Sequence, residues 1–104
     1  MNKENNSKLL QTLGLVQASR SLISGNTLFE LVKAGKIKLV LISSDMGESQ
    51  KKKLTDKCNF YKVNVYHDLM TSQELSHAIG KDNVKAIGIK DFKNAKWVKN
   101  IIEE

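Results

Sequence analysis

The chain has 104 residues, 40% of them hydrophobic, which supports one folded domain over residues 1–104 but not two. No segment approaches the roughly 18–20 continuous apolar residues of a membrane span, and the start MNKENNSK lacks the apolar stretch of a secretory signal. The single cysteine excludes an internal disulfide. Seventeen basic against eleven acidic residues give a formal charge of +6, so we expect a cytoplasmic protein with an anionic partner and no membrane association.

Five segments have the apolar spacing of helices, and the chain before the first of them, residues 1–6, is expected to be flexible. The second segment follows a small-residue turn at 24–27 and ends near Gly35, a residue typical of helix ends. The fourth begins with Thr71-Ser72-Gln73-Glu74, which has the spacing of a capping box. The expected helices cover about 7–18, 28–34, 48–60, 71–79 and 91–102.

Strand candidates lie between these helices. Residues 37–43, IKLVLIS, form a β-branched and aliphatic run that is typical of a strand buried on both faces. Residues 63–66 and 84–89 are shorter candidates, and 22–24 is a fourth. Strands that alternate with short helices imply a sheet covered on both faces. The fold class is therefore α/β: a three-layer α/β/α sandwich around a mixed, mostly parallel, four-stranded sheet.

The turn Ser24-Gly25-Asn26-Thr27 is the first candidate site. A helix that starts here leaves backbone N–H groups with a partial positive charge, and these groups suit a phosphate or another anion. The alternative is that the helix caps itself, because Thr27 and Glu30 also have the spacing of a capping box.

Catalytic groups are few. Asp45 follows the main strand, where ligands gather in open α/β sheets, but it has no obvious partner and also suits a turn or a helix cap. Cys58 lies at an apolar helix position, and His67 and His77 have no zinc-site spacing with it. The glycines form no nucleotide-binding pattern. We expect no enzyme activity, no metal and no cofactor.

The excess of basic residues fits nucleic-acid binding better than it fits catalysis. All cations except Arg20 are lysines, so phosphate contacts would predominate over forked contacts to guanine. Lys33 and Lys36 lie near the end of the second helix. Lys51, Lys52, Lys53 and Lys57 form a basic helix face, for which simple solvation is the alternative.

Several segments together resemble a known family. LGL near the start, SG before the second helix, KLVLISSD, KKKLTDKC followed by an aromatic, LSHAIGK and AIGIKD occur in the order seen in small ribosomal proteins that bind kink-turn RNA, the L7Ae and L30e group. The resemblance covers nearly all of the chain after about residue 8 and is greatest to short bacterial members. It implies a three-layer α/β/α fold, no catalysis, and binding of structured RNA in translation or ribosome assembly by a protein that is monomeric when free.

The resemblance also implies two RNA contacts. One is the start of the second helix, which enters the groove beside sheared G·A pairs, and the other is the loop before the last strand, which packs on a flipped nucleotide. The implied RNA-binding residues are Ser24, Gly25, Asn26, Thr27, Lys33, Lys36, Gly80, Lys81, Asn83 and Val84.

The sequence departs from the family pattern within this site. Where many members have Arg-Ala-Gly-Lys, this chain has Ala-Ser-Arg-Ser at 18–21, so only Arg20 stands in for the lysine. The positions of the family's Asn-Glu pair are Thr27 and Leu28, and Asn26 lies one place early. A second hypothesis is therefore a divergent member that has lost strong RNA binding and acts as a protein-interaction module.

Overall fold

The computed structural model describes residues 3–104, with side chains from residue 6 onward. Every helix and strand expected from the sequence is present in the expected order. α1 begins four residues before its expected start, so residues 3–6 are helical, and residues 1–2 of the segment expected to be flexible lie outside the described residues. The elements are α1 (Lys3–Ala18), β1 (Leu22–Ser24), α2 (Thr27–Lys33), β2 (Leu39–Ile42), α3 (Glu48–Phe60), β3 (Asn64–His67), α4 (Ser72–Ile79), β4 (Ala86–Ile89) and α5 (Phe92–Ile102).

The four strands form one sheet in the order β1-β4-β2-β3. β2 and β3 run parallel, but β4 runs antiparallel to both of its neighbours: Ser24 of β1 lies opposite Ile87, and Ile42 of β2 lies opposite Ala86. The sheet is mixed, and the expectation of a mostly parallel sheet is wrong, because two of its three strand pairs are antiparallel. The alternation of strands and helices did not reveal that β4 lies between β1 and β2.

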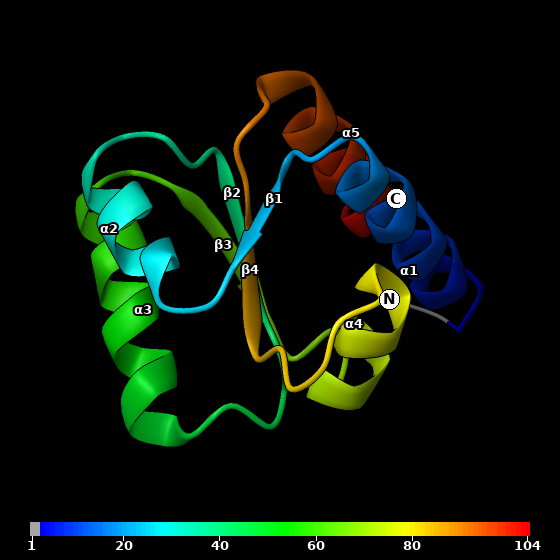
Figure 1. The fold of residues 1–104 in the computed structure, drawn as a ribbon, viewed down its shortest axis with the longest axis horizontal. Helices are drawn as coiled ribbons and strands as arrows, with labels where there is room; N and C mark the ends of the chain where they lie inside the picture. Colours follow the sequence, from blue (N-terminus) through cyan, green and yellow to red (C-terminus); the bar gives the residue numbers. More distant parts are fainter. Residues whose placement is uncertain (1–2) are drawn as a thin grey trace.

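Helices cover both faces of the sheet, α2 and α3 on one face and α1, α4 and α5 on the other (Figure 1). Side chains alternate across a strand, so Leu39 and Leu41 of β2 pack with α1, α4 and α5, whereas Val40 and Ile42 pack with α2 and α3. All four are buried, as expected for a strand covered on both faces. The three-layer α/β/α sandwich is confirmed.

α2 lies close against β4 at Gly88. A Cβ atom at this position would lie 2.5 Å from Leu28 Cδ1 and 3.0 Å from Ile37 Cγ2. Glycine is the residue that permits such a close approach of helix and strand. Because Leu28 belongs to the first turn of α2, this contact also holds the preceding turn in place at the end of the sheet.

Candidate functional site

The antiparallel pairing of β1 and β4 places the end of one strand beside the start of the other. The turn after β1 and the loop before β4 therefore lie at the same end of the sheet, although they are far apart in sequence (Figure 1, cyan and yellow to orange). Together with the start of α3 they surround a hollow of about 370 Å³, the turn–loop hollow. The fold thus brings together the two segments that the sequence singled out.

Six of the expected site residues line the turn–loop hollow: Ser24, Gly25, Asn26, Lys81, Asn83 and Val84. Sequence reasoning did not name the other lining residues: most of them come from α2, from the β2–α3 connection, from α3 and from the start of β4, whereas Asp82 and Lys85 belong to the loop itself. These are Leu28, Phe29, Met46, Gln50, Leu54, Asp82, Lys85 and Ala86. The lining of the hollow is therefore mixed: apolar side chains lie beside polar ones, and two lysines and one carboxylate are among them.

The turn is shaped by Gly25, whose φ of 88° lies in the left-handed region that favours glycine. Asn26 is the N-cap residue of α2, but its side chain makes no capping hydrogen bond. The expected capping box of Thr27 and Glu30 is wrong, because Thr27 is already helical and Asn26 has helical backbone angles, whereas a capping box needs an extended N-cap residue. The Asn26 amide is therefore not engaged in capping the helix.

The loop is held in place by Ser76, a buried residue of α4 that the sequence did not single out. The Val84 N–H donates to Ser76 Oγ at 2.8 Å, and the Lys81 N–H donates to the Ser76 carbonyl at 3.0 Å. Gly80 ends α4 in the left-handed conformation, and Asn83 also has a positive φ, of 56°. These contacts fix the loop backbone beside the hollow before any ligand binds.

The remaining expected site residues lie around the hollow rather than in its wall. Thr27 is exposed in the first turn of α2, and Gly80 lies on the α4 side of the loop. Lys33 and Lys36 lie at the other end of α2. Arg20 precedes β1 whereas Gly25 follows it, so a strand of about 10 Å separates them and Arg20 does not join the turn.

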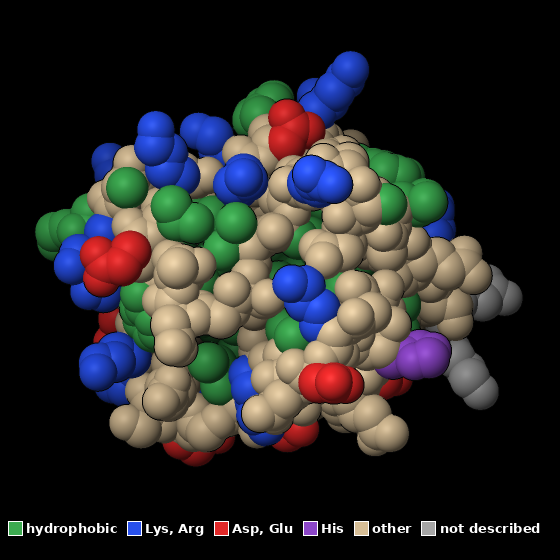
Figure 2. All heavy atoms as spheres, viewed as in Figure 1, with side chains coloured by type: hydrophobic (Ala, Val, Ile, Leu, Met, Phe, Trp, Pro, Cys, Tyr) green, Lys and Arg blue, Asp and Glu red, His purple; other side chains and the backbone are tan. Residues whose placement is uncertain are grey.

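Lys33 lines a second hollow of about 400 Å³ between α2 and α3, the α2–α3 hollow, together with Lys53 and Lys57. Phe29 and Gln50 line both this hollow and the turn–loop hollow, so the two adjoin. Basic side chains also lie along the left margin of the face in Figure 2, beside α2 and α3, and along its upper margin. No helix within residues 3–104 is long and apolar enough to cross a membrane.

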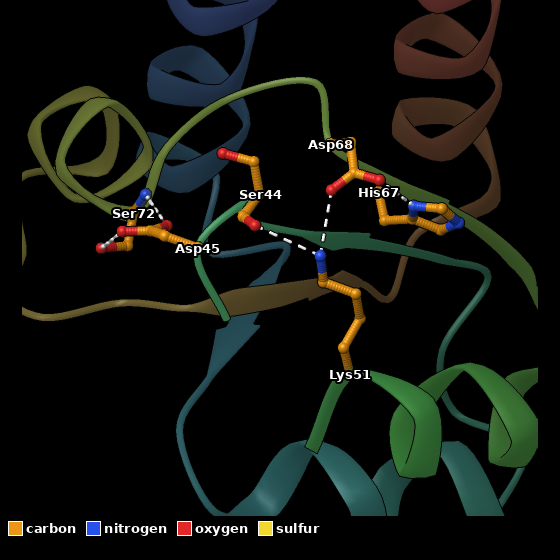
Figure 3. Close-up of polar contacts among 6 residues, drawn as sticks. All are labelled: Ser44, Asp45, Lys51, His67, Asp68 and Ser72. Atoms are coloured by element: carbon orange, nitrogen blue, oxygen red, sulfur yellow. Dashed lines mark hydrogen bonds and ion pairs between the residues drawn. The ribbon is translucent and has the colours of Figure 1, made fainter. Parts of the chain in front are cut away.

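The lysine run of α3 divides among different contacts. Lys51 Nζ is 3.0 Å from Asp68 Oδ1 and donates to the Ser44 carbonyl at 3.2 Å, and its side chain is only 15% exposed (Figure 3). Lys52 pairs with Asp56 at 2.9 Å. Lys53 and Lys57, in contrast, line the α2–α3 hollow. The run is thus not a single solvated face.

Asp45, the candidate catalytic carboxylate, holds the first residue of α4. Its Oδ1 accepts from the Ser72 N–H at 2.8 Å and its Oδ2 from the Ser72 hydroxyl at 3.2 Å (Figure 3). The Ser72 N–H is the main reason why the pKa of Asp45 lies below its usual range. Asp45 therefore has the geometry of a cap, but for α4 rather than for the next helix.

The structure also places Cys58 and the two histidines, the other candidate catalytic or metal-binding residues. Cys58 is fully buried, and burial raises the pKa of its thiol to about 11, so it is protonated at neutral pH. His67 Nδ1 lies 2.7 Å from Asp68 Oδ2, and His77 is exposed. Among the described side chains, those of residues 6–104, no three of His, Cys, Asp or Glu lie together as a metal site would require.

Comparison with known proteins adds a consistent set of relatives. Residues 7–99 match the profile of the family described as ribosomal protein L7Ae/L30e/S12e/Gadd45. RNA-binding protein YlxQ of Enterococcus faecium is 35% identical over 104 residues, 99% of this chain and 99% of that protein. RNA-binding protein YlxQ of Bacillus subtilis (strain 168) is 35% identical over 80 residues, 76% of this chain and 79% of that protein.

Two solved structures are also similar. A protein with unknown function from Bacillus halodurans C has a TM-score of 0.88 and 38% identity, and the match covers 93% of this chain and 98% of that chain. The 15.5kD RNA binding protein of Giardia lamblia has a TM-score of 0.79 at 19% identity, covering 99% of this chain and 88% of that chain. The second likeness shows a shared fold.

Proposed function

We propose that this chain, which belongs to the ribosomal protein L7Ae/L30e/S12e/Gadd45 family, binds structured RNA through the turn–loop hollow. The observation that carries the proposal is the meeting of residues 24–26 with residues 81–84 around that hollow. Two relatives bear the name RNA-binding protein, which supports it. The RNA would be a kink-turn or a similar irregular motif of ribosomal RNA, bound without catalysis during translation or ribosome assembly.

The chemistry of the hollow suits such an RNA. Structured RNA is read mainly where bases are opened out of the helix, and a hollow of about 370 Å³ that is partly lined by apolar side chains can receive a flipped base. Asn26 offers an amide for base edges, while Lys81 and Lys85 offer charges for phosphates. The Asp82 carboxylate repels phosphates and would therefore limit how the RNA backbone approaches the hollow.

Fluorescence anisotropy with a labelled kink-turn duplex tests the proposal, with a fully paired duplex of equal length as the control RNA. We expect tighter binding to the kink-turn duplex. About four phosphate contacts would give a log–log slope of affinity against salt of roughly −3. Absence of measurable binding to either duplex at low salt would sink the proposal.

Two variants separate the roles within the site. Asn26→Ala should weaken kink-turn binding about tenfold while leaving the fully paired duplex unaffected, because it removes a base contact. Lys81→Ala should weaken binding to both duplexes and reduce the salt slope by about one. Lys96→Ala on α5, which removes the same charge from outside the hollow, is the matched control and should change neither RNA affinity.

The protein-interaction hypothesis is supported by one observation: Arg20, which stands in for the family's lysine, lies at the wrong end of β1 for the turn. Co-sedimentation with ribosomal particles distinguishes the two. RNA binding predicts that ribonuclease releases the chain from the particles. A protein contact predicts that the association survives both ribonuclease and high salt.

A further inference from the structure

Two aromatic side chains at the end of α3 are exposed to solvent. Phe60 is 77% exposed and Tyr61 is 39% exposed, with their ring centroids 4.9 Å apart and their planes at 73°. The side of α3 that faces the sheet is supplied instead by Leu54 and Cys58, which are fully buried. The aromatic pair therefore does not serve the core, and the ring surface that the two side chains do not cover on each other remains available for a ligand.

Lysines surround this pair. Lys53 and Lys57 line, with Phe60 and Tyr61, a hollow of about 400 Å³, the aromatic hollow. Neither lysine forms an ion pair with any of residues 6–104, and Asp56, the one carboxylate in the lining, is paired with Lys52. Aromatic faces flanked by free cations are the combination that binds single-stranded nucleic acid, because bases stack on the rings and phosphates meet the cations.

The aromatic hollow is continuous with the proposed RNA site. Lys53 and Lys57 also line the α2–α3 hollow, which in turn shares Phe29 and Gln50 with the turn–loop hollow. The helical period puts Gln50, Lys53, Lys57 and Phe60 on one face of α3. From Gln50 to Phe60 the helix rises about 15 Å, which is the length of about four stacked nucleotides.

We infer that a single-stranded extension of the bound RNA lies along this face of α3 and stacks its bases on Phe60 and Tyr61. The inference rests on the proposed function, and it adds a second surface that recognises unpaired nucleotides next to the structured motif. An RNA strand fits better than an acidic peptide, because the path from the proposed RNA site passes two lysines, Lys53 and Lys57, and ends at exposed aromatic rings on which bases can stack.

The test compares a blunt kink-turn duplex with the same duplex carrying an unpaired tail of about four nucleotides at each of its four strand ends in turn. For the wild-type chain, we expect a tail at one of these ends to raise the affinity about tenfold. Phe60→Ala should abolish most of this gain and leave the affinity for the blunt duplex unchanged. Phe60→Tyr, which keeps the ring, should retain the gain.

Phe92→Ala is the matched control, because Phe92 is 68% exposed but lies on α5, across the sheet. It should alter neither affinity. The inference is overturned if no tail raises the wild-type affinity, or if Phe60→Ala keeps the full gain. Failure of the proposed function gives a different result: the wild-type chain would not bind even the blunt duplex. The inference would then fail with it.

Discussion

At the scale of single residues, Asp45 and Asp68 show how carboxylates at the ends of β2 and β3 serve the fold. Asp45 accepts two hydrogen bonds from Ser72, and Asp68 contacts His67 at 2.7 Å and Lys51 at 3.0 Å. The contact with His67, followed by that with Lys51, lowers the pKa of Asp68, as the Ser72 N–H lowers that of Asp45. Both side chains are therefore charged at neutral pH.

Because the pKa of Asp45 is lower in the folded than in the unfolded chain, its charged form stabilises the fold above the usual aspartate pKa of about 4. This stabilisation is lost as the pH falls from that value through the lower pKa of the folded state. The Asp45→Asn variant should thus unfold at lower urea than wild type at about pH 6, and the difference between the two midpoints should shrink by about pH 3. Equal differences at both pH values would contradict this role.

Sequence reasoning identified the residues of the site that come from its two glycine-containing segments. Gly25 and Asn83 have positive φ values, and their residue types and the turns around them are visible in the sequence. Phe29 and Gln50 were missed, because only the packing of α2 and α3 against the sheet brings them to the hollow. The placement of these site residues as RNA contacts stays a prediction.

At the scale of elements, the same Thr-x-x-Glu spacing occurs before two helices but caps only one. Thr71 is extended (φ −81°, ψ 165°), accepts from the Glu74 N–H at 3.1 Å, and its own N–H donates to Glu74 Oε1 at 2.9 Å. Thr27 lies one position inside α2, because the Gly25 turn makes Asn26 the N-cap residue. The spacing alone could not distinguish the two, because the cap depends on backbone angles.

Thr71→Ala should therefore lower the free energy of unfolding by about 1 kcal/mol, since it removes the cap of α4. Thr27→Ala, its matched control, should change the free energy of unfolding by less than about 0.5 kcal/mol, since no capping bond is lost. Urea unfolding followed by circular dichroism measures both. A larger decrease in the free energy of unfolding for Thr27→Ala than for Thr71→Ala would contradict the conclusion that Thr71 caps its helix and Thr27 does not.

The positions of the helices and strands along the chain were predictable, but the direction of the strands was not. The buried run 37–43 and the capping box at Thr71 are local signals, and β2 and α4 lie where they indicated. The position of β4 between β1 and β2 depends on which neighbours bury the apolar faces of the strand. The position of β4 is therefore set by the whole core, and it is this position that brings the turn after β1 and the loop before β4 together.

At the scale of the whole molecule, the family inferred from the sequence is confirmed, and the three layers explain how a small fold exposes an extended surface. The sheet and Gly88 fix the turn, Ser76 fixes the loop, and α3 extends from the hollow with Lys53 and Lys57 on its outer side. The formal charge of +6 supplies a field that favours approach of a polyanion. The site thus combines a hydrogen-bonded loop backbone with exposed lysine side chains.

The most direct test of the central claim, that the turn and the loop form one RNA-binding surface, is an NMR titration. Amide chemical shifts of the labelled chain are followed as unlabelled kink-turn duplex is added. The largest changes should occur together at residues 24–27 and 80–85, with little change in α5. Changes confined to one of the two segments, or centred on α5, would contradict the claim.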